Sequence, residues 1–196
     1  MGIVALLLLA AFGVACLLVP AVLHVRSTGR SPFLTGGAHG PLAIAAFAAP
    51  FGLAIALDLS GTGRLLHGPV PAASGIALAV AGVVGTAWCQ RAMGASWRVG
   101  IDPDERTALV TTGPYRSVRN PIYTAMFAFS LGLTLLVPNA ASLLGMVAVV
   151  AVIDLVVRRV EEPYLDSVHG TDFRAWAGRT GRFLPGLGRL RPSGPA

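Results

Sequence analysis

The sequence contains no lysine, and all 15 of its strongly basic side chains are arginine. This absence excludes a lysine Schiff base and the lysine of a phosphate-binding P-loop. Only two cysteines occur, Cys16 and Cys89, and both lie inside apolar runs, where cysteine behaves as a small buried hydrophobe. Neither the cysteines nor the four histidines show the spacing of a metal site, so we expect no bound metal.

Charge of either sign is also scarce. Only 12% of the residues are charged, whereas 54% are hydrophobic and the mean hydropathy is +0.70. A soluble domain has about 25% charged residues, so this composition predicts an integral membrane protein. The pI of about 10.6 would suit a nucleic-acid binder, but the arginines flank apolar runs. The positive-inside rule explains them better, and we expect no nucleic-acid partner.

Five apolar runs predict an all-α bundle of five transmembrane helices. A helix of about 20 residues crosses about 30 Å of hydrocarbon, and the first run is longer than the core of a signal peptide and lacks its charged start. Pro138 and Asn139 separate the last two runs by a short turn, so these two should form a helical hairpin. We expect one domain over residues 1–188 and a disordered Pro/Gly-rich tail over 189–196. The predicted spans are residues 3–25, 41–59, 70–90, 122–137 and 140–157.

Arginine placement predicts the orientation. With five spans, every arginine except Arg64 falls on one side of the membrane. The positive-inside rule makes that side cytoplasmic, so the N-terminus should lie outside an inner or plasma membrane and the C-terminus inside. Small residues in the third span should let a neighbouring helix approach closely. These are Ala77, Ala79, Ala81, Gly82, Gly85 and Ala87.

A polar block over residues 111–123 separates the third and fourth spans. Arg119 and Tyr123 are four residues apart, so both should lie near the first turn of the fourth span. Asn120 is a suitable N-cap, and Pro121 suits the first helical position, where a missing N–H has no cost. The free N–H groups at this helix start suit a carboxylate ligand.

Two carboxylates, Glu161 and Glu162, follow the fifth span. Carboxylates near membrane depth are functional candidates, although Arg158 and Arg159 lie close enough along a helix to pair with them. Because the chain goes out and returns through the hairpin, the polar block and this pair should meet at one membrane face. Arginine, tyrosine and carboxylate side chains in one place suit a small zwitterionic ligand.

This ordered set resembles the signature of isoprenylcysteine carboxyl methyltransferases and the related phospholipid methyltransferases. The resemblance covers roughly residues 93–185. The matching pieces are Gly113-Pro114-Tyr115-Arg116, Val118-Arg119-Asn120-Pro121-Ile122-Tyr123, Glu161-Glu162, the segment from Val168 to Trp176, Arg179, and Phe183-Leu184-Pro185.

The resemblance implies S-adenosylmethionine bound in a cytosol-facing pocket of a five-helix core. Arg119 and the helix start suit its carboxylate, a glutamate suits its ammonium or a ribose hydroxyl, and the tyrosines suit adenine or the sulfonium. The implied catalytic residues are Arg119, Asn120 and Arg179. The implied cofactor-binding residues are Gly113, Pro114, Tyr115, Arg119, Asn120, Pro121, Tyr123, Glu161 and Glu162.

The chain departs from the family pattern in two places. Asn120 stands where the family has a histidine, and it cannot titrate. Phe173 and Trp176 replace tyrosines, which removes two hydroxyls. The implied acceptor is an amphipathic, lipid-like molecule entering from the bilayer, with the carboxylate of a prenylated cysteine favoured and a lipid amine left open. An NADPH-dependent sterol-type reductase and a non-enzymatic scaffold or permease are the alternatives.

Overall fold

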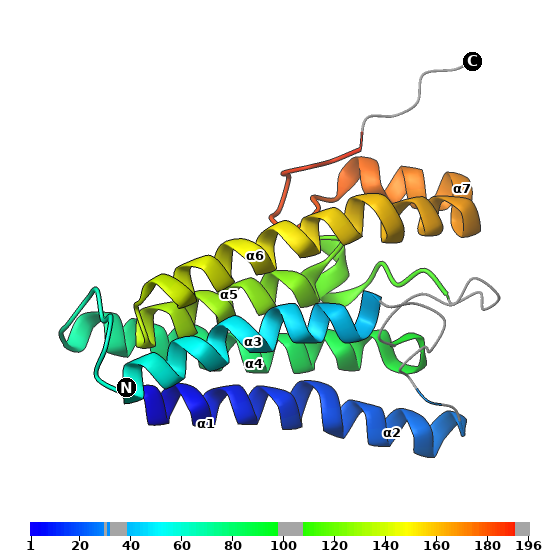
Figure 1. The fold of residues 1–196 in the computed structure, drawn as a ribbon. Coiled ribbons are helices and arrows are strands. Elements are labelled where there is room, and N and C mark those ends of the chain that lie inside the picture. The colour runs from blue at the N-terminus through cyan, green and yellow to red at the C-terminus, as the bar shows by residue number, and fades with distance from the viewer. Residues whose placement is uncertain (30, 32–38, 98–107, 191–196) are drawn as a thin grey trace.

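The structure, a computed structural model, describes residues 1–29, 31, 39–97 and 108–190. Within these ranges it is a bundle of long helices without strands, which confirms the predicted all-α fold (Figure 1). The helices are α1 (Gly2–Gly13), α2 (Val19–Thr28), α3 (His39–Leu59), α4 (Pro69–Met93), α5 (Pro121–Leu136), α6 (Ala140–Val156) and α7 (Glu162–Arg179).

The five predicted spans correspond to five apolar helical segments. Three continuous helices are long and apolar enough to cross a membrane: Gly2–Thr28, Pro69–Met93 and Ala140–Arg179. The apolar segments Phe47–Leu59 and Pro121–Leu136 are shorter. At 1.5 Å per residue, the latter spans only about 24 Å. The helix that holds the last predicted span continues past residue 157 through a π-helical turn into α7, which is kinked at Gly170 (φ +49°). The bounds of the membrane spans stay predictions.

Two π-helical turns, Val14–Leu18 and Val157–Glu161, join consecutive helices. Each turn ends two residues before a proline, Pro20 or Pro163. Proline lacks an N–H, and its ring clashes with the carbonyl four residues earlier in an α-helix. A local change to the wider π register accommodates the proline while the helix axis continues. As a result α1 continues into α2, and α6 continues into α7 as far as the kink at Gly170.

Helices α4 and α5 pack with almost no space between their backbones. A Cβ atom added at Gly132 of α5 would lie 2.5 Å from the backbone nitrogen of Ala79, and one added at Gly82 would lie 2.6 Å from the Cβ of Phe129. The predicted close approach is therefore confirmed at Ala79 and Gly82. Two other small residues of the predicted set, Ala77 and Ala81, are exposed and take no part in this seam.

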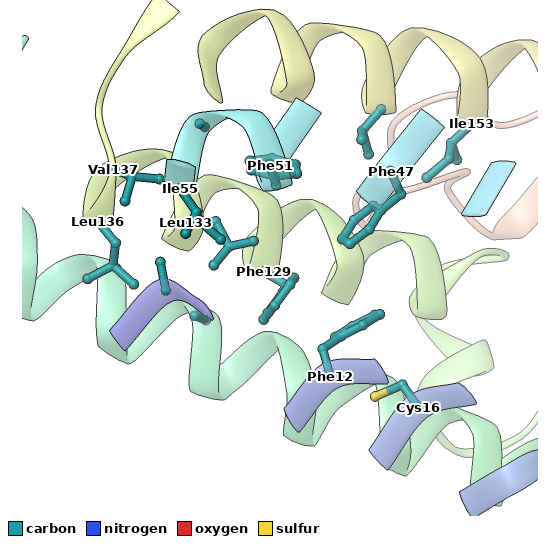
Figure 2. Packing of buried hydrophobic residues seen from close by; sticks show 14 of the residues in the cluster. Phe12, Cys16, Phe47, Phe51, Ile55, Phe129, Leu133, Leu136, Val137 and Ile153 are labelled. Carbon is teal, nitrogen blue, oxygen red and sulfur yellow. The ribbon is translucent and has the colours of Figure 1, made fainter. Parts of the chain in front are cut away.

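Four phenylalanines from three helices form the centre of the apolar core (Figure 2). Phe12 of α1 stacks on Phe129 of α5 with ring centroids 4.4 Å apart, and Phe47 of α3 lies 5.5 Å from Phe12. Phe51 continues this cluster along α3. Stacked rings add to the stabilisation from burial. The cluster holds α1 and α3 against α5.

At the end of the bundle opposite the polar block, polar side chains connect neighbouring helices and loops. Asn139 caps α6, and its Nδ2 atom donates to the carbonyl of Ala54 at 2.8 Å. Arg64 pairs with Asp58 and donates to the carbonyl of Leu136 at 3.2 Å. Among the described arginines, Arg64 alone lies at this end, as predicted. Which end faces the cytoplasm stays a prediction.

The predicted disordered tail falls mostly outside the described residues, because the description ends at Leu190. Leu190 itself is attached to the bundle, since its N–H donates to the carbonyl of Ala177 at 3.1 Å.

Replacing Gly132 with alanine is expected to destabilise the protein by about 1–3 kcal/mol, because the new methyl group meets the backbone of α4. Gly13→Ala is the matched control. A Cβ at Gly13 meets nothing within 4 Å and the backbone there is helical, so stability should be unchanged or slightly higher. Denaturant titration in mixed micelles measures both, and equal stabilities would contradict the described seam.

Candidate functional site

The polar block forms a short 3₁₀ turn, Gly113–Arg116, followed by an extended segment that leads into α5. Gly113 has φ +59°, a conformation that favours glycine. Pro121 occupies the first turn of α5, and Asn120 occupies the N-cap position, both as predicted. The side chain of Asn120 does not cap the helix, however; its Nδ2 atom donates to the carbonyl of Arg182 at 3.3 Å.

The segment that follows α7 lies against the start of α5. Val118 and Gly181 form an isolated parallel bridge. The N–H of Arg119 donates to the carbonyl of Gly181 at 2.8 Å, and the N–H of Asn120 donates to that of Arg182 at 3.0 Å. The hydroxyl of Thr124 donates to the carbonyl of Phe183 at 2.6 Å. The polar block and the C-terminal segment are thus one structure, although about 60 residues of sequence lie between them.

Glu162 lies between two arginines in a buried cluster, here called the ion triad (Arg119, Glu162 and Arg182). Arg119 donates to Glu162 Oε1 from Nη2 at 2.7 Å and from Nε at 3.2 Å. Arg182 donates from Nε to Oε1 at 2.9 Å and from Nη2 to Oε2 at 2.8 Å. The side chains are 2%, 11% and 9% exposed for Arg119, Glu162 and Arg182, so the triad is shielded from water.

Arg119 uses all five of its N–H groups within the protein. Besides the two bonds to Glu162, Nη1 donates to the carbonyls of Ala177 (3.0 Å) and Thr180, and Nη2 donates to that of Gly188 at 2.8 Å. Burial lowers the pKa of the Arg119 guanidinium, and the hydrogen bonds to Glu162 oppose that effect. In this arrangement Arg119 has no donor left for a ligand, so it holds the C-terminal segment in place.

Arg182 is the arginine that the sequence interpretation missed. The resemblance pointed to Arg179, which is exposed and forms no ion pair within the described residues. Hydrogen bonding to Glu162 raises the pKa of Arg182. The one available signal was its position directly before Phe183-Leu184-Pro185, in the segment that carries the resemblance. The predicted catalytic role of Arg179 stays a prediction.

Glu161 has a different environment from its neighbour. The hydroxyl of Tyr123 donates to the Glu161 carboxylate, and both residues are only partly buried. Among the described residues no ion pair involves Glu161. Arg158, which helical spacing placed within reach of the glutamates, pairs instead with Asp154 at 2.7 Å, one helical turn earlier.

The buried side chain of Tyr115 lies near Tyr123 and Glu161. The Tyr115 hydroxyl donates to the carbonyl of Cys89 at 3.4 Å. Nε1 of Trp176 donates to the backbone carbonyl of Tyr115 at 3.2 Å. Burial raises the pKa of the Tyr115 hydroxyl, and the nearby Cys89 and Glu161 raise it further. The hydroxyl is therefore neutral at physiological pH. Phe173 packs on Trp176 with ring centroids 6.1 Å apart, and this apolar cluster replaces the two family hydroxyls.

The structure therefore divides the predicted residues into two groups. Arg119 and Glu162 belong to the ion triad, whereas Tyr123, Glu161 and Tyr115 form a second group, here called the tyrosine–glutamate group. The ligand contacts predicted for these residues, and for Gly113, Pro114, Asn120 and Pro121, stay predictions.

The family model for phospholipid methyltransferases matches residues 70–172, which run from α4 into α7. The chain belongs to the phospholipid methyltransferase family. This confirms the resemblance found in the sequence and indicates a membrane methyltransferase. The match includes the tyrosine–glutamate group and two members of the ion triad, and Arg182 lies beyond it. No curated protein matches the chain.

Glu162→Gln is expected to destabilise this phospholipid methyltransferase family member by about 3 kcal/mol, because it leaves two buried arginines facing one another without a carboxylate. Asp154→Asn removes a more exposed carboxylate from the preceding helix, so it should cost less than about 1 kcal/mol. Denaturant titration of both variants tests the difference. Similar losses would mean that the triad contributes no more than an exposed pair.

Proposed function

We propose that the protein transfers a methyl group from S-adenosylmethionine to an amphipathic, lipid-like acceptor, with the carboxylate of a prenylated cysteine-like compound as the favoured acceptor. The reaction would take place at the end of the bundle that carries the polar block, on the cytoplasmic side. The tyrosine–glutamate group is the observation that carries this proposal.

Glu161 is suited to bind a cation. It is a partly buried carboxyl group whose partner within the described residues is the neutral hydroxyl of Tyr123. Burial raises the pKa of Glu161, and a bound cation would supply the positive charge that favours its ionised form. Two tyrosine rings lie near it, and aromatic faces attract ammonium and sulfonium groups. Glu162 is not equivalent, because the ion triad already surrounds it with two guanidinium groups. We therefore assign recognition of the cofactor's cationic groups to Glu161.

The start of α5 is suited to bind the cofactor's carboxylate. Helices leave their first N–H groups without helical acceptors, and among the described residues no side chain caps those of α5. These N–H groups and the helix dipole favour an anion there. Ile122 and Tyr123 carry such groups, and Tyr123 is also the residue whose hydroxyl donates to Glu161. This assignment gives the helix start the role that the sequence had suggested for both it and Arg119.

The residues present therefore fit the cofactor. When bound, S-adenosylmethionine supplies an electrophilic methyl group on a sulfonium centre. The chain's contribution is to hold the reactants in line and to exclude water, because methyl transfer needs little acid–base help. The ion triad fixes the C-terminal segment over the start of α5 and so keeps the N–H groups and Glu161 in a constant arrangement.

A carboxylate acceptor suits this site because it has no proton to lose. An ammonium acceptor must be deprotonated before it can be methylated, and Asn120 cannot accept a proton at the position where the family has histidine. The apolar outer surface of the bundle suits an acceptor that diffuses within the bilayer, since many large hydrophobic side chains on α1, α4 and α6 are exposed.

Glu161→Gln is expected to weaken S-adenosylmethionine binding about 10–100-fold, because a charge-assisted contact to a cation is lost. Isothermal titration calorimetry of the purified protein in lipid nanodiscs measures the affinity. Asp154→Asn, which removes a carboxylate from the preceding helix, is the control and should bind as the wild type does. No binding to the wild type, or equal binding by Glu161→Gln, would remove the proposal.

Restoring the family histidine with Asn120→His tests the acceptor. If a carboxylate is methylated, the variant should transfer methyl groups to N-acetyl-S-farnesylcysteine at a rate within a few-fold of the wild type. If the acceptor is an amine, the variant should instead gain activity on phosphatidylethanolamine. Radiolabelled methyl transfer to each acceptor measures the two rates, and the second outcome would contradict the carboxylate assignment.

A further inference from the structure

Two buried polar side chains on α4 each have an oxygen atom without a hydrogen-bond partner among the described residues. Thr86 and Gln90 are four residues apart, so they share one face of the helix, and they are only 1% and 8% exposed. Among the described residues, Thr86 Oγ1 and Gln90 Oε1 have no partner. Unpaired polar atoms in an apolar membrane interior are costly, so such a pair needs an explanation.

The orientation of the Gln90 amide is fixed. Its Nε2 atom donates to the carbonyl of Cys16 at 2.7 Å. That carbonyl lacks its usual helical donor because Pro20, four residues later, has no N–H. Turning the amide over would place Oε1 against a carbonyl oxygen, which is repulsive. Gln90 Oε1 therefore remains a hydrogen-bond acceptor that the protein does not use.

Thr86 differs from the other buried hydroxyls in the bundle. Ser130 and Thr134 each donate to the carbonyl four residues earlier in α5, at 2.8 and 2.9 Å. This local bond is the usual way for a hydroxyl to be satisfied inside a helix. Thr86 makes no such bond within the described residues. Within the described residues the Thr86 hydroxyl therefore keeps an unused donor and an unused acceptor in an almost fully buried position.

The pair lies beside the tyrosine–glutamate group. Gln90 directly follows Cys89, whose carbonyl accepts the hydrogen bond from Tyr115. Thr86 lies one turn, about 5.4 Å, farther from the polar end of α4. The two free atoms thus lie at the level where the polar site gives way to apolar helix surfaces. A lipid-like molecule reaching into the polar site would have the junction of its head and its chain at this level.

We infer that the Thr86–Gln90 pair binds a neutral O–H or N–H group on the amphipathic acceptor, at the junction between its reacting head and its apolar chain; the inference rests on the proposed function. Gln90 Oε1 can only accept a hydrogen bond, so the ligand group must be a hydrogen-bond donor. The pair carries no charge, so a hydroxyl or an amide N–H fits better than an ammonium group, which would need a carboxylate there. A single bound water has the same hydrogen-bonding chemistry.

Two probes separate an acceptor group from water. 1-Dodecanol carries a neutral hydroxyl on an apolar chain, and dodecyl methyl ether keeps the oxygen but cannot donate. In dimyristoylphosphatidylcholine nanodiscs, dodecanol should raise the midpoint of thermal unfolding by about 2 °C or more over the ether, since a bound ligand stabilises the folded state. Equal shifts, including no shift with either probe, overturn the inference and leave water as the partner.

Thr86→Val locates the effect, because valine keeps the shape of threonine without its hydroxyl. The variant should lose the difference between dodecanol and the ether. Thr134→Val is the matched control: it removes a hydroxyl that is already bonded within α5, so it should lower the midpoint without ligand and keep the difference. A difference that persists in Thr86→Val also overturns the inference.

Calorimetry with S-adenosylmethionine keeps this test separate from that of the proposed function. Thr86→Val should bind the cofactor with wild-type affinity, because Thr86 belongs to neither group described at the polar end. If the wild type fails to bind the cofactor but distinguishes the two probes, the methyltransferase proposal fails and the binding subsite stands. If cofactor binding is normal and the probes are not distinguished, only the subsite fails.

Discussion

The ion triad is the interaction on which the functional end of the molecule depends. It joins three parts of the chain that are distant in sequence: the start of α5, the start of α7 and the C-terminal segment. A buried ion pair stabilises little by itself, because two charges must leave water. Here the backbone carbonyls around Arg119 satisfy its remaining donors, so the triad fixes one arrangement of these parts.

The triad also gives the neighbouring carboxyl groups of Glu161 and Glu162 different environments. Consecutive residues on a helix point about 100° apart, so Glu161 and Glu162 cannot face the same partner. Glu162 faces the arginines, and Glu161 faces Tyr123 at the end of the π-helical turn. Glu162 pairs with two guanidinium groups and holds the structure together. Burial raises the pKa of Glu161, whose hydrogen-bond partner among the described residues is the Tyr123 hydroxyl. Pro163, which follows both, accounts for the π-helical turn at this point.

The sequence predicted the helical architecture because apolar runs and turn residues are local signals. It also placed Pro121 and Asn120 at the start of α5, since helix starts have a recognisable pattern. The partners of the glutamates were not predictable in the same way. Spacing along a helix allowed Arg158 or Arg159, but the partners of Glu162 are Arg119 and Arg182. Arg182 reaches Glu162 only after the chain turns back beyond α7. Long-range pairing of this kind leaves no periodic signal.

The central claim is that Glu161 meets the cofactor while the ion triad stays closed. An experimental structure of the protein with S-adenosylhomocysteine, determined in lipid nanodiscs, tests it most directly. We expect the ligand's ammonium within about 3 Å of the Glu161 carboxylate, with Glu162 still bonded to Arg119 and Arg182. A ligand bonded to Arg119 or Glu162, with the triad opened, would contradict it.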